Sequence, residues 1–291
     1  MGPIGVFDSG MGGLTVLRAL HQRLPHEDLI YFGDTARVPY GTKGARTVRA
    51  FARQDAAFLA SLGVKMIVVA CNTASAFALD YLTRLFDVPV LGVITPGVQT
   101  ALSRTRGGNI GVVGTSGTIR SGRYQEGLSR AIPAERILAR ECPLFVPLVE
   151  EGMTDHPVTD LVVAEYLLPL REAQVDTLIL GCTHYPVLKP VIGRYMGPEV
   201  TLVDSADALA EAAADLLAAS ELARNGTATA VDAPDTGQAA GRLTFYLSDI
   251  PWKFAEVGAR FLGQPIDDVT TVNLDEVEAA GRLVYNGKEG S

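Results

Sequence analysis

The chain has 291 residues, of which 47% are hydrophobic and 20% are charged, and its formal net charge is -8. This length suits two domains, and the composition is that of an ordinary globular protein with a large core. The acidic balance argues against a general nucleic-acid-binding protein, because such proteins need a basic face.

The start of the chain, "MGPIGVFDSG", has no basic segment followed by a long apolar run, so no secretory signal is expected. The longest charge-free stretch, residues 88–103, contains two prolines and several polar residues, which argues against a membrane span. The three cysteines form no CxxC pair, which indicates free thiols in a reducing compartment. We therefore expect a cytoplasmic protein with neither membrane nor nucleic-acid partners.

Short apolar runs alternate with amphipathic stretches along the chain, starting near the N-terminus. The runs at 4–7, 29–32, 66–70 and 90–94 predict strands, and the 3.6-residue periodicity at 13–24, 47–63 and 75–86 predicts helices. This alternation is typical of βαβ units, in which a parallel sheet is covered by helices on its faces.

The pattern then restarts in the second part of the chain. "IGVFDSGMGG" at Ile4 is echoed by "IGVVGTSGTI" at Ile110, and "MIVVACNTAS" is echoed by "TLILGCTHYP". Parallel strands resemble one another, so chance similarity is the alternative, but the order of the motifs is the same in both halves. We predict an α/β fold of two pseudo-symmetric, open parallel-sheet domains.

The predicted first domain comprises residues 1–95 and 207–263, and the second comprises residues 96–206. Residues 221–242 are rich in Ala, Gly, Thr and Asp, which predicts a surface loop or linker. A strand at 242–248 and a helix beginning at Pro251 would then rejoin the first domain. Residues 264–291 are predicted to be a peripheral C-terminal tail.

Two of the three cysteines stand at the ends of predicted strands. In open parallel sheets, ligands bind outside the carboxyl ends of the strands. Cys71 and Cys182 each precede the predicted start of a helix, where free N–H groups favour a thiolate, and His184 is a possible proton partner for Cys182. The alternative for each is a buried structural thiol. Cys142 has no flanking hydroxyl or histidine and is predicted to be structural.

A carboxylate and a hydroxyl, Asp8 and Ser9, end the first predicted strand in "FDSGMGG". The glycines would let backbone N–H groups approach an anion, and the alternative is that Asp8 or Ser9 caps the following helix. The segment lacks the Lys-Ser/Thr ending of a P-loop and the GxGxxG spacing of a dinucleotide-binding loop. The other histidines, His21, His26 and His156, have no zinc-ligand spacing, and the first two are predicted to be solvated. No metal or cofactor is expected.

Six segments together carry a family resemblance: "GVFDSGMGGLTVL", "YFGDTARVPYG", "VVACNTASA", "GTSGTIRSGRY", "PLFVPLVEEG" and "LGCTHYP". In this order, over residues 4–262, the chain resembles the bacterial glutamate racemases. The resemblance implies two pseudo-symmetric α/β domains with the active site in the cleft between them. It also implies cofactor-independent interconversion of L- and D-glutamate, supply of D-glutamate for peptidoglycan and cell shape, and a homodimer.

The same resemblance implies roles for individual residues. Cys71 and Cys182 would be the two acid/base thiols; Asp8 would assist Cys71, and His184 with Glu150 would assist Cys182. Glu150 is the matching position in "PLVEEG", and its neighbour Glu151 is the alternative. The substrate-binding residues would be Asp8, Ser9, Tyr40, Gly41, Asn72, Thr73, Thr118, Thr183 and His184.

This implied chemistry agrees with the residue types. Racemisation removes the α-hydrogen from one face of the carbon and returns a proton to the other face, so a held substrate needs two bases on opposite sides. One cysteine must be a thiolate while the other is a thiol, and the site must stabilise a carbanionic transition state. The amide, hydroxyl and backbone N–H groups after each cysteine suit the α-carboxylate, where charge develops.

Three other functions remain open at this point. A racemase for aspartate is the nearest, because one methylene is worth only about 1–3 kcal/mol in a pocket. A non-catalytic amino-acid-binding protein would be expected to have lost one of the two cysteines, and both are present. A cysteine hydrolase using Cys182 and His184 would leave Cys71 unexplained.

Overall fold

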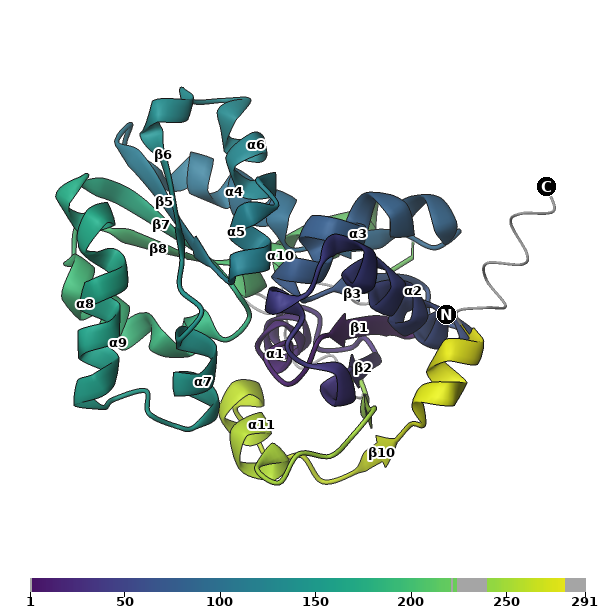
Figure 1. Ribbon diagram of the computed structural model, residues 1–291. Helices are drawn as coiled ribbons and strands as arrows, with labels where there is room; N and C mark the ends of the chain where they lie inside the picture. The colour runs from purple at the N-terminus through teal and green to yellow at the C-terminus, as the bar shows by residue number, and fades with distance from the viewer. Residues whose placement is uncertain (1, 221, 224–239, 281–291) are drawn as a thin grey trace.

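The computed structural model describes residues 2–220, 222–223 and 240–280, and these residues form two α/β domains side by side (Figure 1). Every strand pair in both sheets is parallel. The first sheet has the order β10-β9-β2-β1-β3-β4 and the second has the order β6-β5-β7-β8. The strands are β1 (Ile4–Asp8), β2 (Leu29–Gly33), β3 (Met66–Val69), β4 (Val90–Gly92), β5 (Asn109–Gly114), β6 (Ile137–Glu141), β7 (Val175–Gly181), β8 (Thr201–Asp204), β9 (Leu243–Leu247) and β10 (Val269–Thr271).

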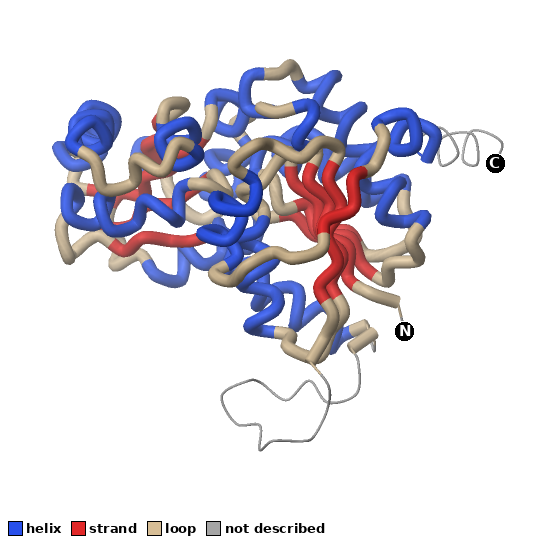
Figure 2. The backbone as a smooth tube through the Cα atoms, turned by 90° about the horizontal axis from the view of Figure 1, so that it is seen from below, coloured by secondary structure: helices blue, strands red, loops and turns tan. Residues whose placement is uncertain are grey.

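Helices surround both sheets (Figure 2). The first domain holds α1 (Leu14–Arg23), α2 (Ala45–Ser61), α3 (Asn72–Leu85) and α11 (Phe254–Leu262). The second holds α5 (Ser116–Arg120), α6 (Arg123–Ser129), α7 (Phe145–Glu150), α8 (Pro157–Glu172) and α9 (Lys189–Met196). Two further helices, α4 (Ile94–Arg104) and α10 (Ser205–Ala219), pack against each other at the junction of the domains. Short 3₁₀ helices are η1 (Thr35–Arg37), η2 (Tyr40–Thr42), η3 (Ala134–Arg136) and η4 (Tyr185–Leu188).

The two halves share one strand order. In the first sheet β2-β1-β3-β4 are neighbours, and in the second β6-β5-β7-β8 occupy the same places. The predicted repeat is therefore confirmed, with β1 matching β5 and β3 matching β7. Strands β1 and β3 are buried along their whole length, because helices cover both faces of the sheet. This burial explains why they read as continuous apolar runs in the sequence.

The core is continuous across the domain junction. One large cluster of buried apolar side chains joins one face of the first sheet, α1 and α10 to the whole second domain. A second cluster lies between the other face of the first sheet and helices α2 and α3. Because α10 packs on both α1 and α4, it couples the two sheets. Within the described residues, no helix combines the length and the apolar character that crossing a membrane requires.

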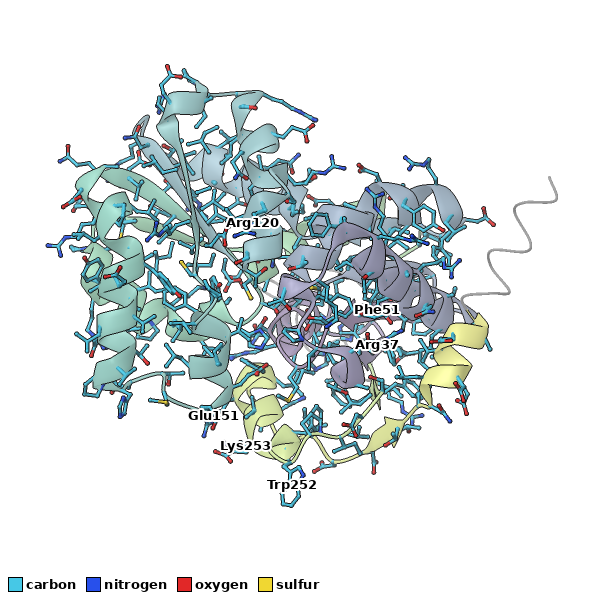
Figure 3. The ribbon with its side chains drawn as sticks, in the orientation of Figure 1. Arg37, Phe51, Arg120, Glu151, Trp252 and Lys253 are labelled. Carbon is cyan, nitrogen blue, oxygen red and sulfur yellow. The ribbon has the colours of Figure 1, made fainter. Side chains whose placement is uncertain are left out.

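The predicted start of the last helix differs from the structure. Helix α11 begins at Phe254 rather than Pro251, and the Phe254 N–H donates to the Pro251 carbonyl at 2.8 Å in a turn. The apolar helical stripe starts only at Phe254, and Trp252 projects fully exposed from the surface (Figure 3). The loop predicted at 221–242 falls largely outside the described residues.

The segment after residue 264, predicted as a peripheral tail, is integrated into the first domain up to residue 280. Strand β10 pairs in parallel with β9 and forms the edge of the first sheet. Val272 and Val277 are buried in the α2–α3 side of the core. Three strand residues are too few to show an alternating pattern in the sequence, which is why the segment reads as a polar tail. Residues 281–291 lie outside the described part.

Val277→Ala tests this integration. Removing two buried methyl groups should lower the free energy of unfolding by about 1.5–3 kcal/mol, measured by urea denaturation. Glu276→Ala, at the exposed neighbouring position, should change it by less than about 0.5 kcal/mol. Equal small effects of both changes would contradict a buried role for Val277.

Candidate active site

Both strand-end cysteines open onto one cavity of about 310 Å³ between the domains. The first domain contributes Ser9, Gly10, Val38, Pro39, Tyr40, Gly41, Thr42, Cys71, Asn72 and Thr73, and the second contributes Thr115, Ser116, Pro143, Val146, Pro147, Glu150, Cys182, Thr183 and His184. This volume is near the lower end of the range for small-molecule pockets, so it suits a compact ligand.

Cys71 occupies the N-cap position of α3. Its Sγ accepts from the Ala74 N–H at 3.4 Å and donates to Ser9 Oγ at 3.6 Å. Burial, with a further contribution from the nearby Asp8 carboxylate, raises the pKa of the Cys71 thiol to about 12. Cys71 therefore holds its proton at neutral pH.

Cys182 lies in a different electrostatic setting. Its Sγ is 3.9 Å from His184 Nδ1, and His184 Nε2 is 2.9 Å from Glu150 Oε1. Burial alone would lower the pKa of His184, but the contacts with Cys182 and Glu150 outweigh it and raise the pKa to about 10. His184 is thus a cation at neutral pH, and its charge stabilises negative charge on the adjacent sulfur.

The glutamate that faces His184 is Glu150. Glu151 instead turns outward and forms an ion pair with Lys253, the residue before α11 (Figure 3). On its other side, the His184 ring meets the ring of Phe261 edge-on, with centroids 5.2 Å apart. Helix α11 therefore packs directly against the second domain's half of the site.

Asp8 lies behind the cavity wall rather than on it. It is fully buried, and its Oδ2 accepts from the Gly10 N–H at 3.0 Å. Burial raises the pKa of the Asp8 carboxyl, while the His184 charge and neighbouring backbone N–H groups act in the opposite direction. Neither Asp8 nor Ser9 caps α1, whose N-cap is Gly13, so that interpretation of the motif is wrong.

The glycine-rich turn after Asp8 allows the two domains to approach closely. A Cβ on Gly12 would lie 2.3 Å from Thr183 Oγ1 and 2.4 Å from His184 Nδ1. One turn later, Thr15 Oγ1 donates to the Thr183 carbonyl at 3.1 Å. Only glycine fits at position 12, because the loop that carries His184 occupies the space of a side chain.

Tyr40 and Gly41 lie in the loop that lines the cavity opposite the cysteine strands. The Tyr40 ring is buried and its hydroxyl contacts the carboxylates of Asp34 and Asp55, so it is occupied within the protein. Gly41 packs against α5, where an added Cβ would lie 2.7 Å from Thr115 Cβ. Tyr40 thus lines the cavity as a residue whose hydroxyl is engaged by two carboxyl groups of the protein.

Three threonine hydroxyls join the domains beside Cys71. Thr73 Oγ1 lies 2.9 Å from Thr115 Oγ1 and 3.1 Å from Thr118 Oγ1. Thr118, predicted to hold substrate, is fully buried behind this contact and does not line the cavity, whereas Thr115 does. The sequence repeat could have identified Thr115, because the offset that relates Ile4 to Ile110 also relates Ser9 to Thr115.

The other predicted substrate-binding residues line the cavity. Asn72 Oδ1 accepts from the Tyr124 hydroxyl at 2.7 Å, and its buried Nδ2 has no protein partner. Asn72 and Thr73 begin α3, so their position combines side-chain donors with the positive end of a helix. Thr183 also borders the cavity, directly after Cys182.

The remaining cysteine and histidines lie elsewhere. Cys142 is fully buried, and it is not among the residues that line the cavity. His156 caps α8, accepting from the Val158 N–H at 3.2 Å, and His21 and His26 are half-buried rather than fully solvated. Across the described ranges, no group of three or more His, Cys, Asp or Glu side chains is arranged to hold a metal ion.

Comparisons with known proteins agree with this arrangement. The Asp/Glu/hydantoin racemase family profile matches residues 4–213. The glutamate racemase of Geobacter metallireducens is 51% identical over 94% of this chain and 97% of its own length. The glutamate racemase of Thermus thermophilus, solved with beta-chloro-D-alanine, is 44% identical with a TM-score of 0.81, covering 94% of this chain and 98% of that one. That of Francisella tularensis, solved with D-glutamate, is 38% identical with a TM-score of 0.84 over the same shares.

The unequal settings of the two cavity thiols predict unequal alkylation. At pH 7, iodoacetamide should modify Cys182 at least about tenfold faster than Cys71, because burial and the Asp8 carboxylate keep the proton on Cys71, whereas the cationic His184 lies beside Cys182. The difference should persist to about pH 9 and shrink as His184 loses its charge near pH 10. Peptide mapping by mass spectrometry gives the rates.

The matched variant is His184→Gln, which should slow labelling of Cys182 and leave that of Cys142 unchanged. Faster labelling of Cys71 than of Cys182 in the unmodified protein would contradict the assignment of charge.

Proposed function

The chain belongs to the glutamate racemases, within the Asp/Glu/hydantoin racemase family, and we propose that it interconverts L- and D-glutamate by two-thiol acid/base catalysis without a cofactor. One observation carries the mechanism. Cys71 and Cys182 leave equivalent strands of two pseudo-symmetric domains and open onto one cavity in opposite electrostatic settings.

In the proposed step, the thiolate of Cys182 takes the α-proton from one face of the bound amino acid. The electron pair of the broken C–H bond stays on the α-carbon and spreads into the α-carboxylate. Cys71 then donates its thiol proton to the opposite face of the carbon. The cycle leaves Cys182 as a thiol and Cys71 as a thiolate, which is the form that runs the reverse reaction.

The neighbouring carboxyl and imidazole groups support these two proton positions. His184, held by Glu150, stabilises the thiolate of Cys182 before proton abstraction. Asp8 is buried near Cys71, and its carboxylate helps to raise the pKa of that thiol. Each thiol thus has its own neighbouring ionisable group.

Substrate binding is assigned to neutral donors and one helix terminus. No lysine or arginine is among the described residues that line the cavity, so the two carboxylates would bind to amide, hydroxyl and backbone N–H groups. These are Ser9, Asn72, Thr73, Thr115 and Thr183, with the backbone of Tyr40 and Gly41. The apolar wall of Val38, Pro39, Pro143, Val146 and Pro147 suits the methylene groups of the side chain.

A cysteine hydrolase is the second candidate, and one observation favours it. His184 does face Cys182 and binds Glu150 through its other nitrogen, which is the order of a nucleophile, base and orienting carboxylate. The hydrolase proposal gives Cys71 no role on the same cavity. It also separates the chain from relatives that match over nearly its whole length and are named for glutamate racemisation.

The family resemblance supports the wider setting of the proposal. The product D-glutamate would enter peptidoglycan synthesis and so contribute to cell shape. The enzyme would act in the cytoplasm as a homodimer.

Racemisation in deuterated buffer tests the function directly. We expect loss of optical rotation from both L- and D-glutamate, with deuterium at the α-carbon and no added cofactor. Cys71→Ala and Cys182→Ala should each lower kcat by about a thousandfold or more, because each removes a group that moves a proton. Polarimetry and NMR follow the two signals.

Cys142→Ala is the matched control, since that thiol is equally buried but lies outside the cavity lining, and it should keep its activity within about twofold. Turnover of aspartate instead of glutamate would show that the proposed substrate is wrong. Hydrolysis that survives Cys71→Ala would favour the second candidate.

The two adjacent glutamates give a sharper test of the Cys182 side. Glu150→Gln removes the charge that holds the His184 imidazolium and should lower kcat about 10- to 100-fold. Glu151→Gln breaks only an exposed ion pair with Lys253 and should stay within about twofold. Steady-state kinetics in both directions give the kcat values. Equal values for the two variants would contradict the assignment of Glu150 as the residue that assists Cys182.

A further inference from the structure

A buried polar cluster contacts the cavity-lining loop of residues 38–42 through the Tyr40 hydroxyl. It consists of Asp34, Arg37, Tyr40 and Asp55, and we call it the loop anchor. Asp34 and Asp55 are fully buried, and the Arg37 side chain is 10% exposed. None of its carboxylates or its guanidinium lines the active-site cavity, so the proposed chemistry does not use them.

Contacts within the loop anchor converge on Arg37 and Tyr40. Arg37 Nε donates to Asp34 Oδ2 at 2.7 Å, and its Nη2 donates to Asp55 Oδ1 at 2.9 Å. The Tyr40 hydroxyl lies against both Asp34 Oδ2 and Asp55 Oδ2, the latter at 2.9 Å. The Arg37 guanidinium also stacks 4.2 Å above the ring of Phe51 (Figure 3).

The Tyr40 hydroxyl has one hydrogen but contacts two carboxyl groups. A phenol has one hydrogen to donate, yet its oxygen lies within hydrogen-bond distance of two carboxyl groups. An ionised carboxylate can only accept. If one of the two acids carries a proton, it can donate to the phenol oxygen while the phenol donates to the other acid, and both contacts become full hydrogen bonds.

Their other partners show which acid this is. Asp34 accepts from Arg37 and, through Oδ1, from the Ser248 hydroxyl at 3.0 Å, and so suits the ionised form. Among the described residues, the Asp55 carboxyl group contacts Arg37 and Tyr40. With Asp55 neutral, the charges of Arg37 and Asp34 balance in the buried cluster, whereas two ionised acids would leave an uncompensated negative charge. Burial and the Asp34 charge accordingly raise the pKa of Asp55 well above its usual range.

We propose that Asp55 is held as a neutral carboxylic acid that donates to Tyr40, and that it acts as a positioning residue for the substrate-binding loop. Residues 38–42 contribute five of the cavity-lining residues, and Tyr40 is the point at which this loop is tied to α2. At its other end, the loop anchor reaches the β1 side of the site, because the Asp34 N–H donates to the Asp8 carbonyl at 3.0 Å.

The first test compares three variants by kinetics, and it rests on the proposed function. Asp55→Asn keeps the shape of a neutral acid, since its amide can donate to Tyr40 and accept from Arg37, and KM should stay within about twofold. Asp55→Ala and Tyr40→Phe each remove the contact and should raise KM for glutamate about tenfold, with kcat changed much less. If Asp55→Asn weakens binding as much as Asp55→Ala, the neutral acid is wrong.

The second test needs no turnover. Infrared spectroscopy at neutral pH separates the C=O stretch of a carboxylic acid from carboxylate bands, and Asp55→Asn should remove one carboxylic-acid band from the spectrum. Glu27→Gln is the matched control, because Glu27 is an equally buried acid whose carboxylate pairs with Lys65 at 2.6 Å, far from the cavity lining. That change should remove no such band and leave KM unaltered.

The outcomes separate the two proposals. An unchanged carboxylic-acid signal in Asp55→Asn overturns the protonated Asp55, whatever the enzyme does. A lost band with an unaltered KM in Asp55→Ala, in a protein that still turns over glutamate, overturns the positioning role. A lost band in a protein without racemase activity leaves the protonated Asp55 standing and rejects the proposed function.

Discussion

The proposed mechanism depends on placing two identical thiols in different electrostatic surroundings across one small cavity. In a region of low dielectric, a single nearby charge decides which form a thiol takes. The His184–Glu150 pair places a cation beside Cys182, while burial and Asp8 keep the proton on Cys71. The proposed proton transfer needs this difference, because two thiols or two thiolates could not move a proton across a substrate.

The two domains are in close contact around the cavity. Gly12 allows the first domain to approach the loop of Thr183 and His184, and α11 packs Phe261 on the His184 ring. The threonine hydroxyls beside Cys71 make the corresponding contact from the other side. The polar contacts near the cavity thus link the domains, while α10 and the continuous core carry the apolar part of the junction.

Much of this arrangement could be predicted from the sequence because parallel sheets place strand ends together. The repeated order of motifs led to the two domains, and the small residues after each apolar run led to Cys71, Asn72, Thr73 and Cys182. Thr118, predicted to hold substrate, does not line the cavity, because spacing along the chain cannot tell which hydroxyl of α5 faces inward. The role of Asp55 could not be foreseen, since it sits in the middle of a helix and acquires its partners only when α2 packs behind the loop.

The sequence repeat relates the two cysteines to each other, but it does not relate Asp8 to His184. The offset that superimposes Cys71 on Cys182 places Thr73 on His184, and the other offset places Asp8 on Gly114. A duplicated scaffold therefore carries an unsymmetrical set of proton donors for a reaction whose two ends are mirror images. Enantiomers have equal free energies in water, so the equilibrium constant of their interconversion is unity, and kcat/KM must be the same in both directions. An effect of this asymmetry on the steady-state constants must change kcat and KM together, so that the enantiomer with the lower KM also has the lower kcat.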